Sequence, residues 1–203
     1  MSLDLNTISN RAFRICGLPE VDFNAEDEQA ALAMALTEQT VNACLSRQHW
    51  SFATRTFKLE RDDTQEFRDG RAYAFNLPGD RLSPPLRLLS DPKDIRSIVR
   101  DFGLEQRFVY VDEAELWGRF IVKTDPDLWP PIFVEAVVFL LASHYALSAA
   151  QKVDLSQEFE RKAVGSAREN GCGGLMGQAL ALDPTPSNRQ SPFDFDILNS
   201  ARG

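Results

Sequence analysis

Two parts of this chain with different sequence periods meet at Ser46-Arg47-Gln48-His49-Trp50-Ser51-Phe52-Ala53-Thr54-Arg55. The residues before this junction repeat at the helical period, whereas those after it alternate polar and apolar side chains over short runs. Trp50 and Phe52 are two positions apart, so an extended backbone would point both rings to the same side. We therefore predict that Trp50 and Phe52 form the structural joint between a helical part and a β part, where each ring buries a large apolar area.

The residues before the junction predict two helices. In residues 5–17 the apolar side chains share one helical face, and Gly17 ends the segment. A second helix is expected from a cap at Asn24 or Asp27 to about Ser46. Its many alanines would let other helices approach it closely.

The middle of the chain predicts an antiparallel sheet or a small sandwich. Short segments with strand character are connected by polar or turn-forming residues, with no helix between them. These segments are residues 54–60, 72–77, 86–89, 97–99, 108–111 and 119–122.

The helical period returns after Trp129-Pro130-Pro131. Residues 132–150 are the most apolar segment of the chain, but the unbroken apolar run covers only 136–142. A membrane-spanning helix needs about 20 predominantly apolar residues, so we expect a central bundle helix and no membrane partner. Residues 154–170 predict a last helix.

These patterns predict an α+β fold in which the N- and C-terminal helices form one bundle and a β-rich antiparallel segment is inserted between them. The expected parts are residues 1–50 and 129–170 for the bundle and 51–128 for the insertion. Residues 171–203 are rich in Gly, Pro, Ser and Asn, and we expect them to form an extended or disordered tail.

Apolar and acidic residues alternate within this tail, from Pro192 to Leu198. Such a segment is either solvated or becomes ordered on a partner, for instance by adding a strand to the sheet edge of a neighbour. Phe193, Phe195 and Ile197 are therefore the candidate partner-interface residues.

The chain carries a formal net charge of -8 over 203 residues. Binding to DNA or RNA draws much of its affinity from Lys and Arg on phosphates, so this balance disfavours a general nucleic-acid-binding protein. It equally disfavours docking on an anionic membrane. The arginines of the β part are interleaved with aromatic residues but also with Asp and Glu, which favours a solvated surface.

The sequence predicts no catalytic, cofactor-binding or metal site. Cys16, Cys44 and Cys172 are far apart and odd in number, which indicates reduced thiols. His49 and His144 have no partners at metal-ligand spacing, and His144 is expected to be a core histidine. A thiol nucleophile that pairs Cys44 with His49, or Cys16 with His144, remains the enzymatic alternative.

Four segments, taken in order, resemble the tail tubular protein A family, the head-to-tail adaptors of short-tailed bacteriophages. They are residues 10–19, residues 49–55 with the sequence His-Trp-Ser-Phe-Ala-Thr-Arg, residues 73–80 before the Arg/Leu-rich segment 86–89, and residues 128–150 before a charged helix. The resemblance rests on their order and spacing and covers about residues 5–170. Residues from Gly171 onward have no counterpart in it.

The resemblance implies a structural virion protein and no enzyme. The chain would form a ring, typically of twelve copies, that docks under the portal protein, connects the capsid to the tail and lines the DNA exit channel used in ejection. Its partners would be the portal protein, the tail nozzle or tail tube protein and further copies of itself, while DNA passes without specific binding. The protein would be made in the cytoplasm of a bacterial host and reside in the virion at the head–tail interface, without a cofactor.

Three alternatives stay open at this point. The first is a head-completion, stopper or tail-completion connector of a long-tailed phage or prophage. The second is a small enzyme that uses Cys44 or His49, in which alanine at either position would abolish an activity. The third is a nucleic-acid-binding module, which predicts duplex binding with a steep salt dependence.

Overall fold

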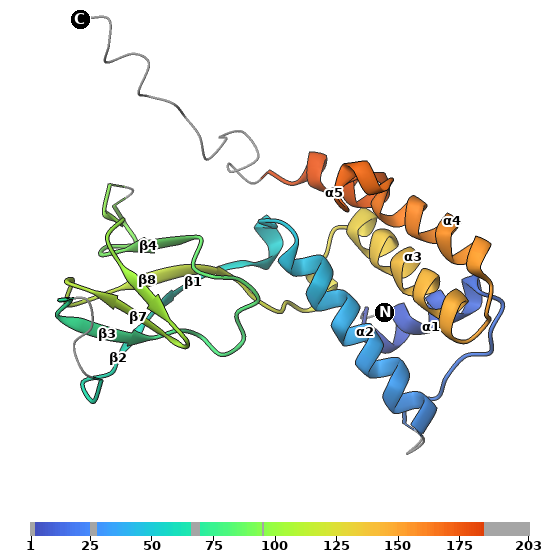
Figure 1. Ribbon diagram of the computed structural model, residues 1–203, viewed down its shortest axis with the longest axis horizontal. Coiled ribbons are helices and arrows are strands. Elements are labelled where there is room, and N and C mark those ends of the chain that lie inside the picture. The colour runs from blue at the N-terminus through green and yellow to red at the C-terminus, as the bar shows by residue number, and fades with distance from the viewer. Residues whose placement is uncertain (1–2, 25–27, 66–69, 95, 185–203) are drawn as a thin grey trace, which may run out of the picture.

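The molecule consists of a helical lobe and a β lobe, which lie side by side in Figure 1. The computed structural model describes residues 3–24, 28–65, 70–94 and 96–184. The chain starts in the helical lobe, passes through the β lobe and returns to the helical lobe. The α+β fold predicted from the sequence is confirmed, with antiparallel sheets inserted between the N- and C-terminal helices.

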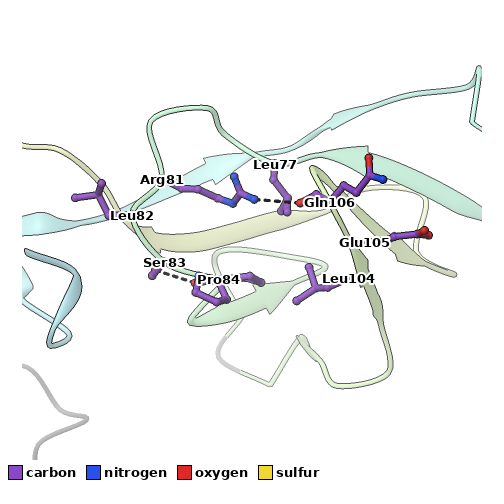
Figure 2. A pocket seen from close by; sticks show the side chains of 9 residues that line it. Leu77, Arg81, Leu82, Ser83, Pro84, Leu104, Glu105 and Gln106 are labelled. Atoms are coloured by element: carbon purple, nitrogen blue, oxygen red, sulfur yellow. Dashed lines mark hydrogen bonds between the residues drawn. The ribbon is translucent and has the colours of Figure 1, made fainter. Parts of the chain in front are cut away.

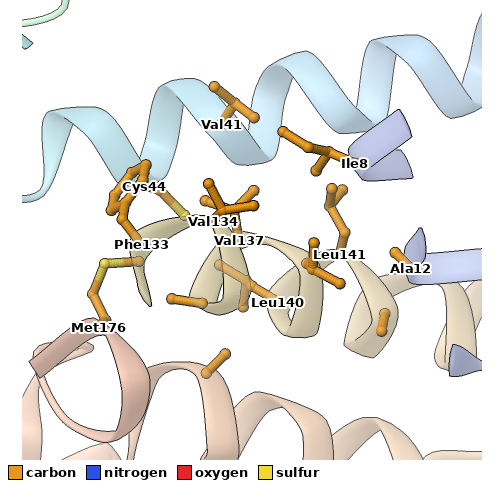
Figure 3. Close-up of a cluster of buried hydrophobic side chains, with 14 of the residues drawn as sticks. Ile8, Ala12, Val41, Cys44, Phe133, Val134, Val137, Leu140, Leu141 and Met176 are labelled. Carbon is orange, nitrogen blue, oxygen red and sulfur yellow. The ribbon is translucent and has the colours of Figure 1, made fainter. Parts of the chain in front are cut away.

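The helical lobe is organised around one apolar helix. The α-helices of the described chain are α1 (Leu5–Ile15), α2 (Glu28–Ser46), α3 (Pro131–Ser148), α4 (Val153–Val164) and α5 (Gly174–Leu182). α3 packs against each of the other helices, and Figure 3 shows it between α2 and the C-terminal helices. Because α3 is covered on several sides, apolar residues surround it instead of forming a single stripe.

α3 is also the one described helix that is long and apolar enough to cross a membrane. In the structure, 61% of this 18-residue segment is buried inside the protein. The central helix of a soluble bundle and a membrane span share this composition, and the burial of α3 matches the bundle position expected from the sequence.

The β lobe is a sandwich of two four-stranded antiparallel sheets. The first sheet has the order β1 (Thr54–Lys58), β8 (Trp117–Ile121), β4 (Arg87–Leu89) and β5 (Ile98–Val99). The second has the order β2 (Glu60–Arg61), β3 (Tyr73–Asn76), β7 (Phe108–Val111) and β6 (Gly103–Glu105). Leu88 and Phe120 of the first sheet and Phe75 and Val109 of the second belong to one buried core.

Gly118 allows the sandwich core to close over β8. A Cβ atom at this position would collide with the ring of Phe120 and would lie 3.4 Å from the side chain of Leu59. A glycine inside a strand often marks such a close approach, and here it leaves room for the fully buried Phe120 ring.

Some details of the β lobe differ from the sequence-based prediction. The extended backbone expected through Trp50 and Phe52 is wrong, because Ser51–Ala53 form a 3₁₀ helix, η1, and β1 starts only at Thr54. β6 is an additional strand that the sequence pattern did not indicate. β7 and β8 follow each other along the chain but lie in different sheets.

The C-terminal part also differs from the prediction. The helix expected over residues 154–170 ends at Val164, where Gly165 adopts a φ of 80°. The extended tail expected from residue 171 is wrong for residues 174–182, which form α5 with Met176 fully buried. A Cβ atom at Gly174 would lie 2.5 Å from the backbone oxygen of Lys162, so this glycine lets α5 approach α4 closely.

Residues 185–203 lie outside the described residues, and they include Phe193, Phe195 and Ile197. Their assignment to a partner interface stays a prediction.

Candidate functional site

Aromatic side chains from three segments meet where the two lobes join. The ring of Trp50 is fully buried and lies 4.9 Å from that of Phe133 in α3, in an edge-to-face arrangement. Phe52 and Trp129 contact the same Phe133 ring, at centroid distances of 5.0 and 5.3 Å. The Nε1–H group of Trp50 donates a hydrogen bond to the backbone oxygen of Cys44 (3.1 Å), which fixes the indole at the end of α2.

The chain crosses this aromatic joint twice. On the way out it passes through η1, and on the way back it passes from β8 to α3. The two crossings are bonded to each other, because the N–H group of Val122 donates to the C=O group of Ala53 (2.9 Å). Ile121, at the end of β8, belongs to the core of the helical lobe. The two lobes are therefore connected by two backbone segments that lie next to each other at the joint.

Sequence reasoning placed Trp50 and Phe52 at the junction but missed Trp129 and Phe133. A signal for them was present, because Trp129 precedes the proline pair at which the helical period returns. The Nε1–H group of Trp129 donates to the hydroxyl of Thr124 (3.0 Å), which anchors the returning segment.

The cysteines and histidines are not arranged for chemistry in the described part of the chain. Cys44 is fully buried, and burial raises the pKa of its thiol to about 12. His49, the partner considered for it, is exposed at the surface. Burial also raises the pKa of Cys16, whose Sγ donates to the backbone oxygen of Ala142 (3.1 Å). A reactive cysteine needs a stabilised thiolate, and these two environments oppose its formation.

His144 lies on α3, where its Nδ1 is 3.1 Å from the hydroxyl of Thr40. Burial lowers the pKa of this imidazole below its ordinary value. Within the described ranges, no group of three His, Cys, Asp or Glu residues could hold a metal ion. His144 thus ties α2 to α3 inside the helical lobe.

A shallow groove of about 440 Å³ lies on the β lobe between the segment 77–85 and the turn after β6. Figure 2 shows Arg81 reaching across it, and this side chain donates to the backbone oxygen of Gln106 (3.2 Å). Leu104 forms part of the opposite wall and is 46% exposed. The groove is open, the hydrogen-bonded side chain of Arg81 crosses it, and Leu104 is exposed in its wall. Such a surface is better suited to contact with another protein than to binding a small substrate.

A second surface of the β lobe is basic. Register places Arg119 of β8 directly between Thr56 of β1 and Arg87 of β4. The neighbouring row contains Lys58 and Trp117, with the Lys58 Nζ 5.1 Å from the indole ring. We call the exposed surface formed by Lys58, Arg87, Trp117 and Arg119 the basic face.

Arg87 and Arg119 give this face positive charge that no acidic side chain of the described residues neutralises. Like charges directly opposite each other on neighbouring strands are unfavourable. Arg119 donates to the hydroxyl of Thr56 (3.4 Å), and no ion pair joins either arginine to an acidic side chain of the described residues. Lys58 alone has a carboxylate partner, Glu115, at 2.8 Å. The basic face is therefore suited to an acidic partner.

Exposed apolar residues occur on both sides of α3. Leu32 on α2 is 64% exposed, while Leu147 and Val153 at the turn between α3 and α4 are 54% and 53% exposed. Figures 1 and 3 both place α2 and the C-terminal helices on opposite sides of α3. The helical lobe thus offers two different apolar positions for contact with other proteins.

No protein-family model matches this chain, and no curated protein matches it.

Proposed function

We propose that this protein is a ring-forming head-to-tail adaptor of a bacteriophage, which docks under the portal protein and connects the capsid to the tail. The resemblance of residues 10–19, 49–55, 73–80 with 86–89, and 128–150 to the tail tubular protein A family motivates the proposal. The observation that carries it is the two-lobed architecture, in which a sandwich is inserted into a bundle closed by both chain ends. The doubly crossed aromatic joint supports a rigid connecting role.

A ring requires each subunit to use two different surfaces, because head-to-tail contacts close only when one face binds another. Leu32 on α2, and Leu147 with Val153 around the turn between α3 and α4, are candidates for these two contacts. A second copy would cover them on assembly, which explains why large apolar side chains remain exposed on the single chain.

The charge of the chain fits a channel through which DNA slides. A lumen with a net negative wall repels phosphates weakly, whereas a wall of Lys and Arg would hold them. In this proposal the basic face of the β lobe therefore points away from the lumen, toward another protein. A ring whose lumen is lined mainly by Lys and Arg would contradict this part of the proposal.

Native mass spectrometry of the protein, alone and mixed with the portal protein of the same genome, tests the proposal. The expected result is a complex with the portal that contains a fixed multiple of the 22.8 kDa chain. Twelve copies would match the resemblance. A chain that stays monomeric and ignores the portal protein would refute the adaptor function.

A pair of variants makes this test specific. Leu32→Glu combined with Val153→Glu places charges on both expected contacts and should prevent ring formation while leaving the fold intact, because both side chains are exposed. Lys93→Glu, in an exposed loop of the β lobe, serves as the control and should still assemble. Equal assembly of both variants would show that these apolar positions are not the ring contacts.

A further inference from the structure

Three arginines lie in one row across the outer side of the first sheet. Arg119 of β8 is directly opposite Arg87 of β4. Leu88 pairs with Val99 of β5, so the next residue in this register, Arg100, extends the row on the far side of Arg87. Leu88 and Val99 belong to the sandwich core, and the alternation of a strand therefore directs Arg87 and Arg100 outward. We call Arg119, Arg87 and Arg100 the arginine row.

The arginine row is exposed, and its charges are not neutralised within the described residues. No ion pair joins any of the three to a carboxylate of this part of the chain, and Arg119 donates to the hydroxyl of Thr56 (3.4 Å). Neighbouring strands are about 4.8 Å apart, so the Cα atoms of the row span only about 10 Å. Like charges opposite each other destabilise a sheet, and residues that break such a local rule are typical of functional sites.

Apolar side chains lie beside the arginine row on the same side of the sheet. Trp117 of β8 is opposite Leu89 of β4, and Leu89 is opposite Ile98 of β5. Trp117 and Ile98 are only partly buried, so both present apolar surface next to the arginines. Arg and Trp are enriched where one protein contacts another. This side of the sheet therefore has the composition of a protein-binding surface with positive charge.

The surroundings of the arginine row favour a narrow acidic partner over a nucleic acid. Carboxylates lie near both ends of the row, because Glu115 pairs with Lys58 at 2.8 Å, and Asp101, which follows Arg100, pairs with Arg71 at 2.6 Å. A duplex that covered this side of the sheet would bring its phosphates close to these carboxylates, which opposes binding. A single helix, about 10–12 Å across with its side chains, covers only the row and the apolar residues beside it.

We infer that the arginine row binds an acidic helix of another protein. Carboxylates at positions i and i+4 on one helical face are about 5–6 Å apart, which is close to the step of about 4.8 Å between strands. Three such carboxylates can each pair with one arginine, while an apolar residue beside them contacts Trp117 and Ile98. Binding neutralises charges that repel each other in the free protein. The inference concerns one side of the β lobe and is independent of the adaptor function.

Two-dimensional NMR titration of the full chain at low ionic strength tests this inference with two capped, alanine-based peptides. Each has about 18 residues, which is long enough for a helix in water. In the first peptide three glutamates and one leucine share a helical face, whereas in the second the same residues stand at consecutive positions and do not. The first should shift the amide signals of Arg87, Arg100 and Arg119 and bind roughly tenfold more tightly than the second.

Charge reversal in the row provides the matched comparison. Arg87→Glu with Arg100→Glu should weaken binding of the first peptide about tenfold, because two of its three ion pairs become repulsive. Lys93→Glu with Arg96→Glu makes the same change of net charge in the adjacent exposed loop and should alter the affinity less than about twofold. Without peptide, Arg87→Glu alone should raise the thermal unfolding temperature by about 1–4 °C, because it replaces two repulsive cross-strand contacts with attractive ones.

Four results would overturn the inference. The first is equal affinity for the two peptides, and the second is an equal loss of affinity in the two charge-reversed pairs. The third is a shift of the arginine signals on dilution without peptide, which would assign the row to a second copy. The fourth is tighter binding of a short DNA duplex than of the first peptide, which would assign the row to phosphates. The experiment contains no portal protein, so its outcome and that of the ring test are separate.

Discussion

The hydroxyl group of Tyr145 connects three helices inside the helical lobe. It lies 2.8 Å from the hydroxyl of Ser9 in α1 and 3.1 Å from that of Thr37 in α2, while its ring stacks on Phe13 at 4.1 Å. All four side chains are buried. A buried polar group costs free energy unless it is paired, so this cluster makes one arrangement of α1, α2 and α3 preferable to others.

Tyr145→Phe should lower the free energy of unfolding by about 1–2 kcal/mol, because the ring stays in place while the hydroxyl of Ser9 loses its partner. Urea denaturation followed by circular dichroism measures this change. Tyr73→Phe on the β lobe is the control and should have a smaller effect, since Tyr73 is only half-buried and contacts Arg61 through its ring. Equal stability of Tyr145→Phe and the natural protein would contradict the role of the cluster.

His144 should make stability depend on pH. Burial lowers its pKa below the ordinary value, and the opposing charge of Glu160 does not fully offset this. The unfolded chain therefore binds a proton at a higher pH than the folded chain does. As the pH falls below the unfolded pKa, protonation favours the unfolded chain and the free energy of unfolding decreases. Between about pH 7 and pH 5, the free energy of unfolding should fall more steeply for the natural protein than for His144→Gln. Parallel curves from urea denaturation would show that His144 does not contribute.

Among the elements, α4 and α5 show that a glycine can either end a helix or allow close packing, depending on the backbone around it. In the sequence, the glycines from 171 to 177 interrupt the helical period and indicate a stop. In the structure, Gly165 ends α4, whereas Gly174 lets the start of α5 pack against the backbone of α4. Whether a glycine ends a helix or permits close packing depends on the backbone next to it, which local sequence does not contain.

Met176 should hold α5 to the helical lobe. Met176→Ala should lower the free energy of unfolding by about 2–4 kcal/mol, because the side chain is fully buried and its removal leaves a cavity. Leu182→Ala, at the 74% exposed end of the same helix, is the matched control and should change stability by less than about 0.5 kcal/mol. Chemical denaturation of both variants gives the comparison, and similar losses would argue against a docked α5.

The strands illustrate which part of the β lobe can be predicted from the sequence. The alternation of polar and apolar residues predicts most of the strands, because one side of each strand faces the core. β6, Gly103–Glu105, shows no such alternation because its only large apolar residue, Leu104, is exposed. The pairing of Arg87 with Arg119, which creates the basic face, depends on the register of β4 against β8. Register follows from packing and turn geometry across distant segments, so the sequence pattern alone could not reveal this site.

At the scale of the whole molecule, the helix–sandwich–helix order and the junction at Trp50 could be predicted, because the change of period is a local signal. The partners of Trp50 could not, since Trp129 and Phe133 come from a segment about eighty residues further along the chain. Contacts of this kind depend on the three-dimensional path of the insertion.

Deletion of residues 185–203 tests the part played by the C-terminal segment in assembly. The thermal unfolding temperature should change little, because both lobes and α5 are complete without these residues. Assembly with the portal protein should weaken, if Phe193, Phe195 and Ile197 contribute to the interface as the sequence predicts. Native mass spectrometry of the full and shortened chains provides the measurement. Unchanged assembly would remove these residues from the interface.

The division of the helical lobe across the chain has a consequence for synthesis on the ribosome. α1 and α2 emerge first, but α3, against which both of them pack, begins only at Pro131. At a translation speed of about 5–20 residues per second, the delay between Ile15 and Pro131 is on the order of ten seconds. During this time the whole sandwich can leave the ribosome and fold, while the apolar faces of the first two helices wait uncovered. The nascent chain therefore has a period in which chaperones that bind exposed apolar segments can shield α1 and α2, and this period ends when α3 is made.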